Sequence, residues 1–154
     1  MTLIQVIKVF ENIASHQPSV NMIVRNDVFR LNAKKDAKYG VFAWLQGQHS
    51  GNLDTSLTSF SFTFFYVDRL TSNLDNQLEV QSVGVQTLTN IIRRMEEVGL
   101  FVSTDYTLQP FNQRFNDECA GVYANVTIQV PDAGSCAESF GDFNDDFNED
   151  FLIY

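Results

Sequence analysis

The chain has 154 residues, 44% of them hydrophobic, which is enough for one core and excludes the disordered and fibrous classes. Its net charge of −9 belongs to the carboxyl end: ten Lys/Arg and ten of the nineteen Asp/Glu residues lie at or before Arg114 and cancel, and the other nine acids follow it. Binding to nucleic-acid phosphates is therefore not expected, nor is a membrane span, because polar residues interrupt the longest apolar run, Phe60–Val67.

An amphipathic helix is predicted over residues 3–16. Its apolar positions recur at spacings of three and four, Thr2 can serve as the N-cap, and Pro18 stops the helix just beyond. This segment lacks the basic leader and continuous apolar block of a signal peptide, so we expect a soluble, non-secreted protein. The apolar stripe consists of Leu3, Val6, Ile7, Phe10 and Ile13.

Strand signals occupy the next part of the chain. Residues 28–33 are typical of a short strand, and residues 39–47 of a longer one rich in aromatic and aliphatic side chains. Gly51 and Asn52 then indicate an exposed hairpin loop over residues 48–55.

The clearest strand covers residues 57–70. One face of this strand is aromatic, with Phe60, Phe62, Phe64 and Tyr66 at alternate positions. The residues between them are first polar (Ser59, Ser61 and Thr63), before Phe65 and Val67 break the pattern. A period of two is typical of a strand with two different faces.

A second helix is predicted from about residue 76 to Val98, and Gly99 ends it. Gly84 lowers the helical propensity of the first half, which leaves room for a later start. The predicted apolar face consists of Leu88, Ile91, Ile92, Met95 and Val98.

Two strands close the body of the chain. In residues 104–115, Pro110 marks an edge position or a bulge, because proline cannot donate to a strand ladder. Residues 119–130 alternate between aliphatic and polar side chains, and Pro131 ends the pattern.

This order of elements predicts an α+β fold, in which an antiparallel sheet of about four to five strands carries two helices packed on one face. We expect a single domain over residues 1–136, followed by an acidic C-terminal extension over residues 137–154.

No pattern typical of a catalytic or cofactor site is present in the sequence. His16 lies at a helix end and His49 in a polar loop, neither beside an arrangement for nucleophilic catalysis, and we expect both to be exposed without a special role. Cys119 and Cys136 belong to no CxxC or Cys/His motif and are expected to be reduced. We therefore predict that the protein is not an enzyme and needs no cofactor.

The acidic extension has a superficial likeness to a calcium loop. Asp142, Asn144 and Asp146 place oxygen ligands at alternate positions. However, Phe147 occupies the position that needs glycine, and Ile153 the position of the bidentate glutamate. We therefore expect no metal site.

A helical stripe of aromatic residues describes the extension better. Its phenylalanines are separated by three, four and four residues, and acids fill most of the remaining surface. Such a helix could dock in a groove of a neighbouring subunit or partner, or its aromatic residues could fold back onto their own core. The candidate docking residues are Phe140, Phe143, Phe147, Phe151, Tyr154, Asp142 and Asp146.

Two stretches resemble a group of small virion proteins of tailed bacteriophages. FFYVDRLTSNLDNQLEVQS at residues 64–82 is similar to an aromatic strand that ends in a V-D-R-L-like turn before a helix. CAGVYANVTIQVP at residues 119–131 is similar to their A-G-x-x-A-x-x-T-x-x-V-P strand. The group is the tail-terminator, tail-completion or neck-ring class, including ring proteins of crAss-like phages; the acidic extension is not part of its pattern.

The resemblance implies a structural virion protein that forms a six-fold or twelve-fold homo-oligomeric ring in the neck or tail, through which DNA passes. Its partners would be adjacent neck or tail-tube proteins, and it would be made in the host cytoplasm. Gln48, His49, Asn52 and Asp54 are candidate contacts to the tail tube or an adjacent ring; otherwise this loop is an ordinary hairpin tip. The main alternative is a small monomeric binding or regulatory module that uses its acidic tail, and a third is an enzyme with an unfamiliar site.

Overall fold

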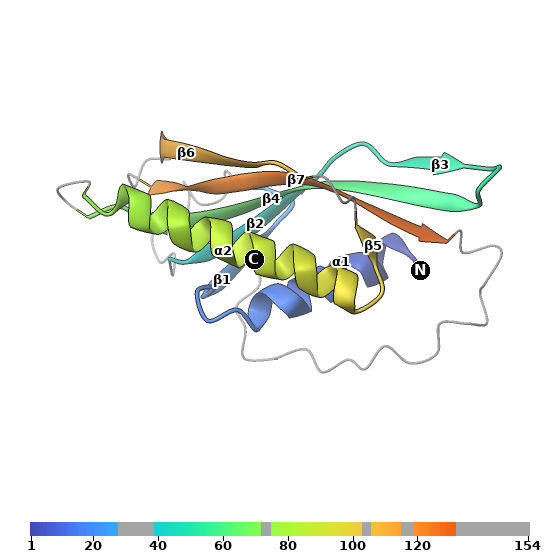
Figure 1. Cartoon of the computed structure of the whole chain (residues 1–154), viewed down its shortest axis with the longest axis horizontal. Helices are drawn as coiled ribbons and strands as arrows, with labels where there is room; N and C mark the ends of the chain where they lie inside the picture. Colours follow the sequence, from blue (N-terminus) through green and yellow to red (C-terminus); the bar gives the residue numbers. More distant parts are fainter. Residues whose placement is uncertain (28–38, 72–74, 103–105, 115–118, 132–154) are drawn as a thin grey trace.

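The computed structural model describes residues 1–27, 39–71, 75–102, 106–114 and 119–131, which form two helices on one face of a seven-stranded sheet (Figure 1). The predicted α+β class, with both helices on one face, is confirmed. The predicted strand over residues 28–33 lies outside the described residues. In chain order the elements are α1 (Leu3–Ser15), β1 (Met22–Arg25), β2 (Val41–Gln46), β3 (Ser50–Asn52), β4 (Leu57–Arg69), α2 (Gln77–Glu97), β5 (Phe101–Val102), β6 (Leu108–Arg114) and β7 (Cys119–Pro131).

Two long antiparallel strands, β4 and β7, form the centre of the sheet. They pair along their full length, from Leu57 opposite Pro131 to Arg69 opposite Cys119. β2 and β3 lie on the outer side of β4, and β5 and β6 lie on the outer side of β7. Of the two alternatives predicted for Pro110, the edge position is confirmed, because β6 pairs only with β7 among the described residues. Pro110 itself pairs in register with Val122, and the bulge lies further on, between Phe111 and Arg114.

The sheet differs from the prediction in strand number and in one strand direction. It has seven strands, and β1 runs parallel to β2, with Met22 opposite Val41. The prediction of an antiparallel sheet of four to five strands was therefore wrong in these details. The reason is that β1 is four residues long and buried on both faces, so it carries no period-two pattern.

Helix α1 begins with a capping box, and the predicted N-cap residue Thr2 is confirmed. The Thr2 hydroxyl accepts a hydrogen bond from the Gln5 backbone N–H at 3.3 Å, and the Gln5 side chain accepts one from the Thr2 backbone N–H at 2.8 Å. Each bond satisfies a backbone donor that the first helical turn leaves without a partner.

Helix α2 begins at Gln77, and Gly84 lies inside it. The reason for a glycine here is tertiary: a Cβ atom at Gly84 would come within 2.9 Å of the Tyr66 ring and 3.1 Å of the Val122 side chain. Glycine therefore lets the helix lie close to the sheet, and the helix does not start late. The predicted apolar face is buried except for Val98, which is 43% exposed at the helix end.

The main core lies between the helices and the sheet. Phe10 of α1 is at its centre, with ring centroids 5.0 Å from those of Phe62 and Phe64 and 5.5 Å from that of Trp44. Edge-on and tilted aromatic pairs of this kind contribute about 0.5–1.5 kcal/mol each beyond simple burial. The alternation predicted for β4 and β7 is confirmed, since the even-numbered residues Phe60–Tyr66 and Ala120–Val130 are buried in this core.

The opposite face of the sheet is divided into two halves. One half is apolar, around Val41, Val67 and Phe111. The other half is polar but uncharged, and its cross-strand pairs are Ser59–Gln129, Ser61–Thr127 and Thr63–Asn125. We call this second surface the uncharged half-face; its side chains are half-buried or exposed.

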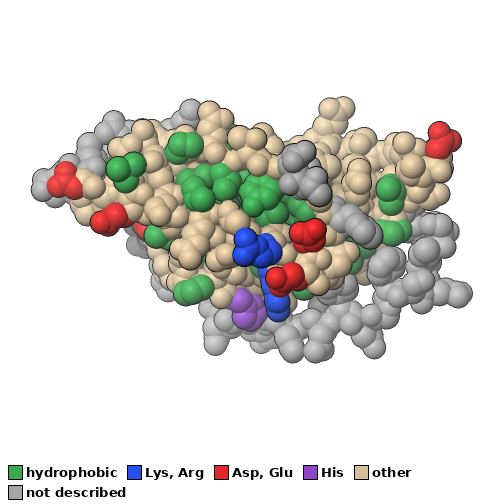
Figure 2. Space-filling model, in the orientation of Figure 1, with side chains coloured by type: hydrophobic (Ala, Val, Ile, Leu, Met, Phe, Trp, Pro, Cys, Tyr) green, Lys and Arg blue, Asp and Glu red, His purple; other side chains and the backbone are tan. Residues whose placement is uncertain are grey.

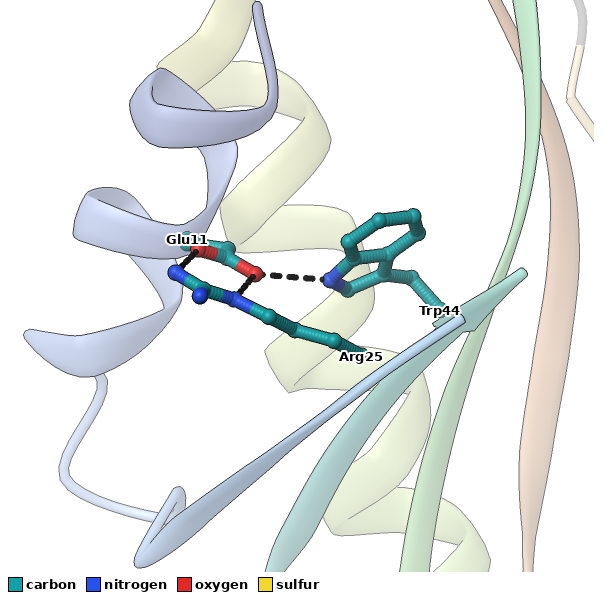
Figure 3. A network of polar contacts seen from close by, with 3 residues as sticks. All are labelled: Glu11, Arg25 and Trp44. Atoms are coloured by element: carbon teal, nitrogen blue, oxygen red, sulfur yellow. Dashed lines mark hydrogen bonds and ion pairs between the residues drawn. The ribbon is translucent and has the colours of Figure 1, made fainter. Parts of the chain in front are cut away.

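An ion pair between a buried glutamate and a half-exposed arginine joins α1 to the sheet (Figure 3). Both carboxylate oxygens of Glu11, whose side chain is 0% exposed, accept hydrogen bonds from Arg25, at 2.7 and 2.6 Å. The indole N–H of Trp44 donates to the same carboxylate at 2.9 Å. The hydrogen bonds that Arg25 donates to Glu11 raise the pKa of the Arg25 guanidinium. Together with the bond from Trp44, these contacts link α1, β1 and β2.

Candidate functional site

The β3–β4 hairpin projects from the end of the sheet (Figure 1). All three residues of β3, Ser50–Asn52, are exposed, and at the turn Leu53 is 95% exposed. Asn52 shapes the turn, because its side-chain oxygen accepts hydrogen bonds from the backbone N–H groups of Asp54 (2.9 Å) and Thr55 (3.2 Å). The predicted hairpin is therefore present and exposed, but Ser50–Asn52, predicted as part of its loop, form strand β3, and the tip is at residues 53–56.

His49 differs from the prediction of an exposed histidine. Its ring is half-buried and packs edge-on against Phe60 with centroids 5.3 Å apart, and its Nδ1 atom is 3.3 Å from the backbone N–H nitrogen of Ser61 that donates to it. The polar composition of the loop concealed this, because the partners of the ring come from β4. His49 therefore holds the hairpin on the sheet, and among the predicted contact residues the side chains of Gln48, Asn52 and Asp54 are exposed.

The edge of β3 carries neither a charged residue nor a proline that would hinder pairing with another strand. Natural sheets protect their edges with lysine, proline, bulges or very short edge strands, and of these β3 has only its length of three residues. The edge strand β6 has Pro110 and a bulge, and β1 has Arg25, but β3 reads Ser-Gly-Asn without charge or proline. Among the described residues, β3 pairs only with β4, so its outer backbone groups remain available to a further strand.

A cleft of about 540 Å³ lies where α1 and α2 meet. Asn12 and Ile13 of α1 line it, with His16 just beyond that helix, and so do Arg93 and Arg94 of α2, with Val98 just beyond that helix. His16 is exposed, as predicted, and its Nδ1 atom lies 2.8 Å from the backbone oxygen of Asn12. Figure 2 shows basic, acidic and histidine side chains gathered in the region of the two helices.

The electrostatics of the cleft are dominated by two adjacent arginines. Arg94 pairs with Glu97 at 2.7 Å, and both side chains are more than half exposed. Arg93 is exposed and makes no ion pair with a described residue. The side-chain oxygen of Asn12 is buried and accepts no hydrogen bond from any described residue. This cleft therefore offers positive charge and polar groups beside the apolar Ile13 and Val98.

The predicted docking residues of the acidic extension, Phe140, Phe143, Phe147, Phe151, Tyr154, Asp142 and Asp146, lie outside the described residues, as does Cys136. Leu53, the β3 edge and the cleft between α1 and α2 were missed by sequence reasoning. The leucine in an otherwise polar loop was a usable signal for the first, whereas the edge and the cleft depend on strand order and helix packing.

Comparison with known proteins found no matching family model and no matching curated sequence. Neither helix of the described residues has the length and hydropathy to span a bilayer. Within the same ranges, no three His, Cys, Asp or Glu side chains come together as metal ligands.

Proposed function

We propose that this chain is a structural subunit that associates with copies of itself into a closed ring. The observation that carries the proposal is the β3 edge, which has no charged residue or proline and lies next to the exposed Leu53 at the hairpin tip. A neighbouring subunit could add a strand to this edge, with main-chain hydrogen bonds supplying affinity and Leu53 supplying an apolar contact.

The setting we propose for the ring is the neck or tail of a tailed-phage virion, as the resemblance of residues 64–82 and 119–131 implies. A ring is a repeated contact between two different surfaces of one subunit, which closes on itself. The uncharged half-face would suit packing between subunits. Its Ser and Thr side chains can be buried at low cost if they are hydrogen-bonded, and no unpaired charge would have to be dehydrated. Adjacent neck or tail-tube proteins are the expected further partners.

The second candidate function is a monomeric binding module that acts through its acidic C-terminal extension. The observation that favours it is the charge distribution, because the nine Asp/Glu residues that account for the net charge of −9 all follow Arg114. The two candidates differ in their response to changes at the hairpin tip.

We expect Leu53→Asp to weaken self-association at least tenfold. Burying one leucine contributes about 1.5–3 kcal/mol, and each 1.4 kcal/mol corresponds to about tenfold in affinity. The readout is native mass by light scattering. The melting temperature should not change, since Leu53 is 95% exposed.

Leu78→Asp is the matched control, because Leu78 is also an exposed leucine (77%) but lies in the first turn of α2, at the opposite end of the molecule from β3 (Figure 1). It should leave association unchanged. Equal effects of the two variants, or none from Leu53→Asp, would exclude the hairpin tip from the interface.

A further inference from the structure

The cleft between α1 and α2 combines the features that an acidic, aromatic peptide needs. Ile13 and Val98 supply apolar surface, and Arg93 and Arg94 supply two adjacent positive charges against the single acid Glu97. Among the described residues, Arg93 makes no ion pair.

The chain itself contains a segment of complementary chemistry. Residues 132–154 carry seven Asp/Glu and no Lys or Arg, and their phenylalanines recur at helical spacing. Burial of each phenylalanine contributes about 1.5–3 kcal/mol, whereas each exposed ion pair contributes about 0.2–1 kcal/mol. Aromatic contacts with the cleft would thus supply most of the affinity, and the arginines would select and orient the acidic segment.

A short stretch of chain separates the segment from the folded domain. It follows Pro131, the last residue of β7. The eight residues 132–139 span up to about 26 Å when extended, and a domain of this size has a radius of gyration of about 14 Å. A tether of this length gives an effective concentration of about millimolar at a site within its span, which favours docking within one molecule.

We infer that residues 140–154 dock in the cleft between α1 and α2 of the same molecule, with their acids facing Arg93 and Arg94. The inference does not depend on ring formation, because both the segment and the cleft belong to one chain. It assigns a binding site to the helix layer, on the face of the sheet opposite the uncharged half-face.

Disulfide trapping in the full chain tests this inference. Val98→Cys is combined with Phe143→Cys or Phe147→Cys, in a chain that also carries Cys136→Ser. The use of two positions in the segment allows for register, since a disulfide requires Cα atoms within about 7 Å. We expect an intramolecular disulfide, seen as a monomer of altered mobility without reductant, whose yield falls as salt screens the charges.

Val85→Cys provides the matched control. Val85 lies in α2 and is 41% exposed, against 43% for Val98, the C-cap of the same helix. The two valines lie about 140° apart around the helix axis. Its cross-linking yield to the same two positions should be about tenfold lower, as expected for an affinity difference of 1.4 kcal/mol.

The role of the arginines is tested by adding further substitutions to the chain that carries the Val98→Cys cross-linking pair. Arg93→Gln/Arg94→Gln should lower the yield at Val98, whereas Ser82→Glu/Gln86→Glu should not, although both pairs change the net charge by −2. All four side chains are exposed, so the melting temperatures should stay close to that of the parent chain.

Three results would overturn the inference. Equal yields at Val85 and Val98 would show that the segment has no preference for the cleft. Disulfide-linked dimers as the main product would show that the cleft takes the segment of a second copy. The absence of cross-linking at Val98 with both Phe143→Cys and Phe147→Cys would show that the segment docks elsewhere or not at all.

Discussion

Gly121→Ala is expected to lower the free energy of unfolding by more than about 3 kcal/mol, and the melting temperature by about 10 °C. A Cβ atom on Gly121 would lie 1.8 Å from the backbone oxygen of Tyr66 and 3.0 Å from the Phe111 ring. The first contact is with backbone, so no rotamer change can relieve it. The central strands β4 and β7 would have to separate, although the whole sheet is built on their pairing.

Thermal unfolding followed by circular dichroism measures this effect, and Gly51→Ala provides the control. Gly51 lies in an exposed strand, where the nearest atom to an added Cβ is the Leu57 oxygen at 3.9 Å. The control should unfold within about 1 kcal/mol of the natural chain, as surface substitutions usually do. A Gly121→Ala chain as stable as the Gly51→Ala chain would contradict the close packing of β4 on β7.

Arg25→Met should lower the free energy of unfolding by about 2–3 kcal/mol. Removal of one partner from a buried ion pair commonly costs about 3–5 kcal/mol, because the other charge stays buried without compensation. Here the Glu11 side chain is fully buried, but Arg25 is 47% exposed and Trp44 still donates to the carboxylate. We therefore expect a loss somewhat below the usual range, measured by urea unfolding at neutral pH.

The double variant Glu11→Leu/Arg25→Met separates the cost of an uncompensated charge from simple loss of contacts. With no charge left to bury, it should regain most of the stability lost in Arg25→Met. A deficit of about 1 kcal/mol should remain, because the Trp44 N–H has lost its acceptor. Equal stability of the single and double variants would mean that Glu11 does not bear an uncompensated charge in Arg25→Met.

The long elements of this fold were predictable because each has a strong period. Phe60–Tyr66 alternate over a whole strand, and Leu88–Met95 keep one helical face. The short strands were not predictable in this way. β1 is buried on both faces, β5 has two residues, and β3 carries the Ser-Gly-Asn composition of a loop.

The polar features of the structure depend on partners distant in sequence. Glu11 lies within an otherwise apolar stripe, but only the fold reveals that Arg25 and Trp44 satisfy it. In the same way, Gly84 lowers the local helical propensity, but a glycine is needed at this position because the Tyr66 ring leaves no space for a Cβ atom. The cleft arises from packing of α1 on α2, so a single sequence gives Arg93 no significance beyond a charged surface position.

Native mass over a wide concentration range, by light scattering or native mass spectrometry of the full chain, tests the central claim of self-assembly most directly. For ring assembly we expect one defined oligomer, whose mass stops increasing once the ring has closed. A chain that remains monomeric at every concentration would contradict ring assembly through the β3 edge and would favour the monomeric binding module.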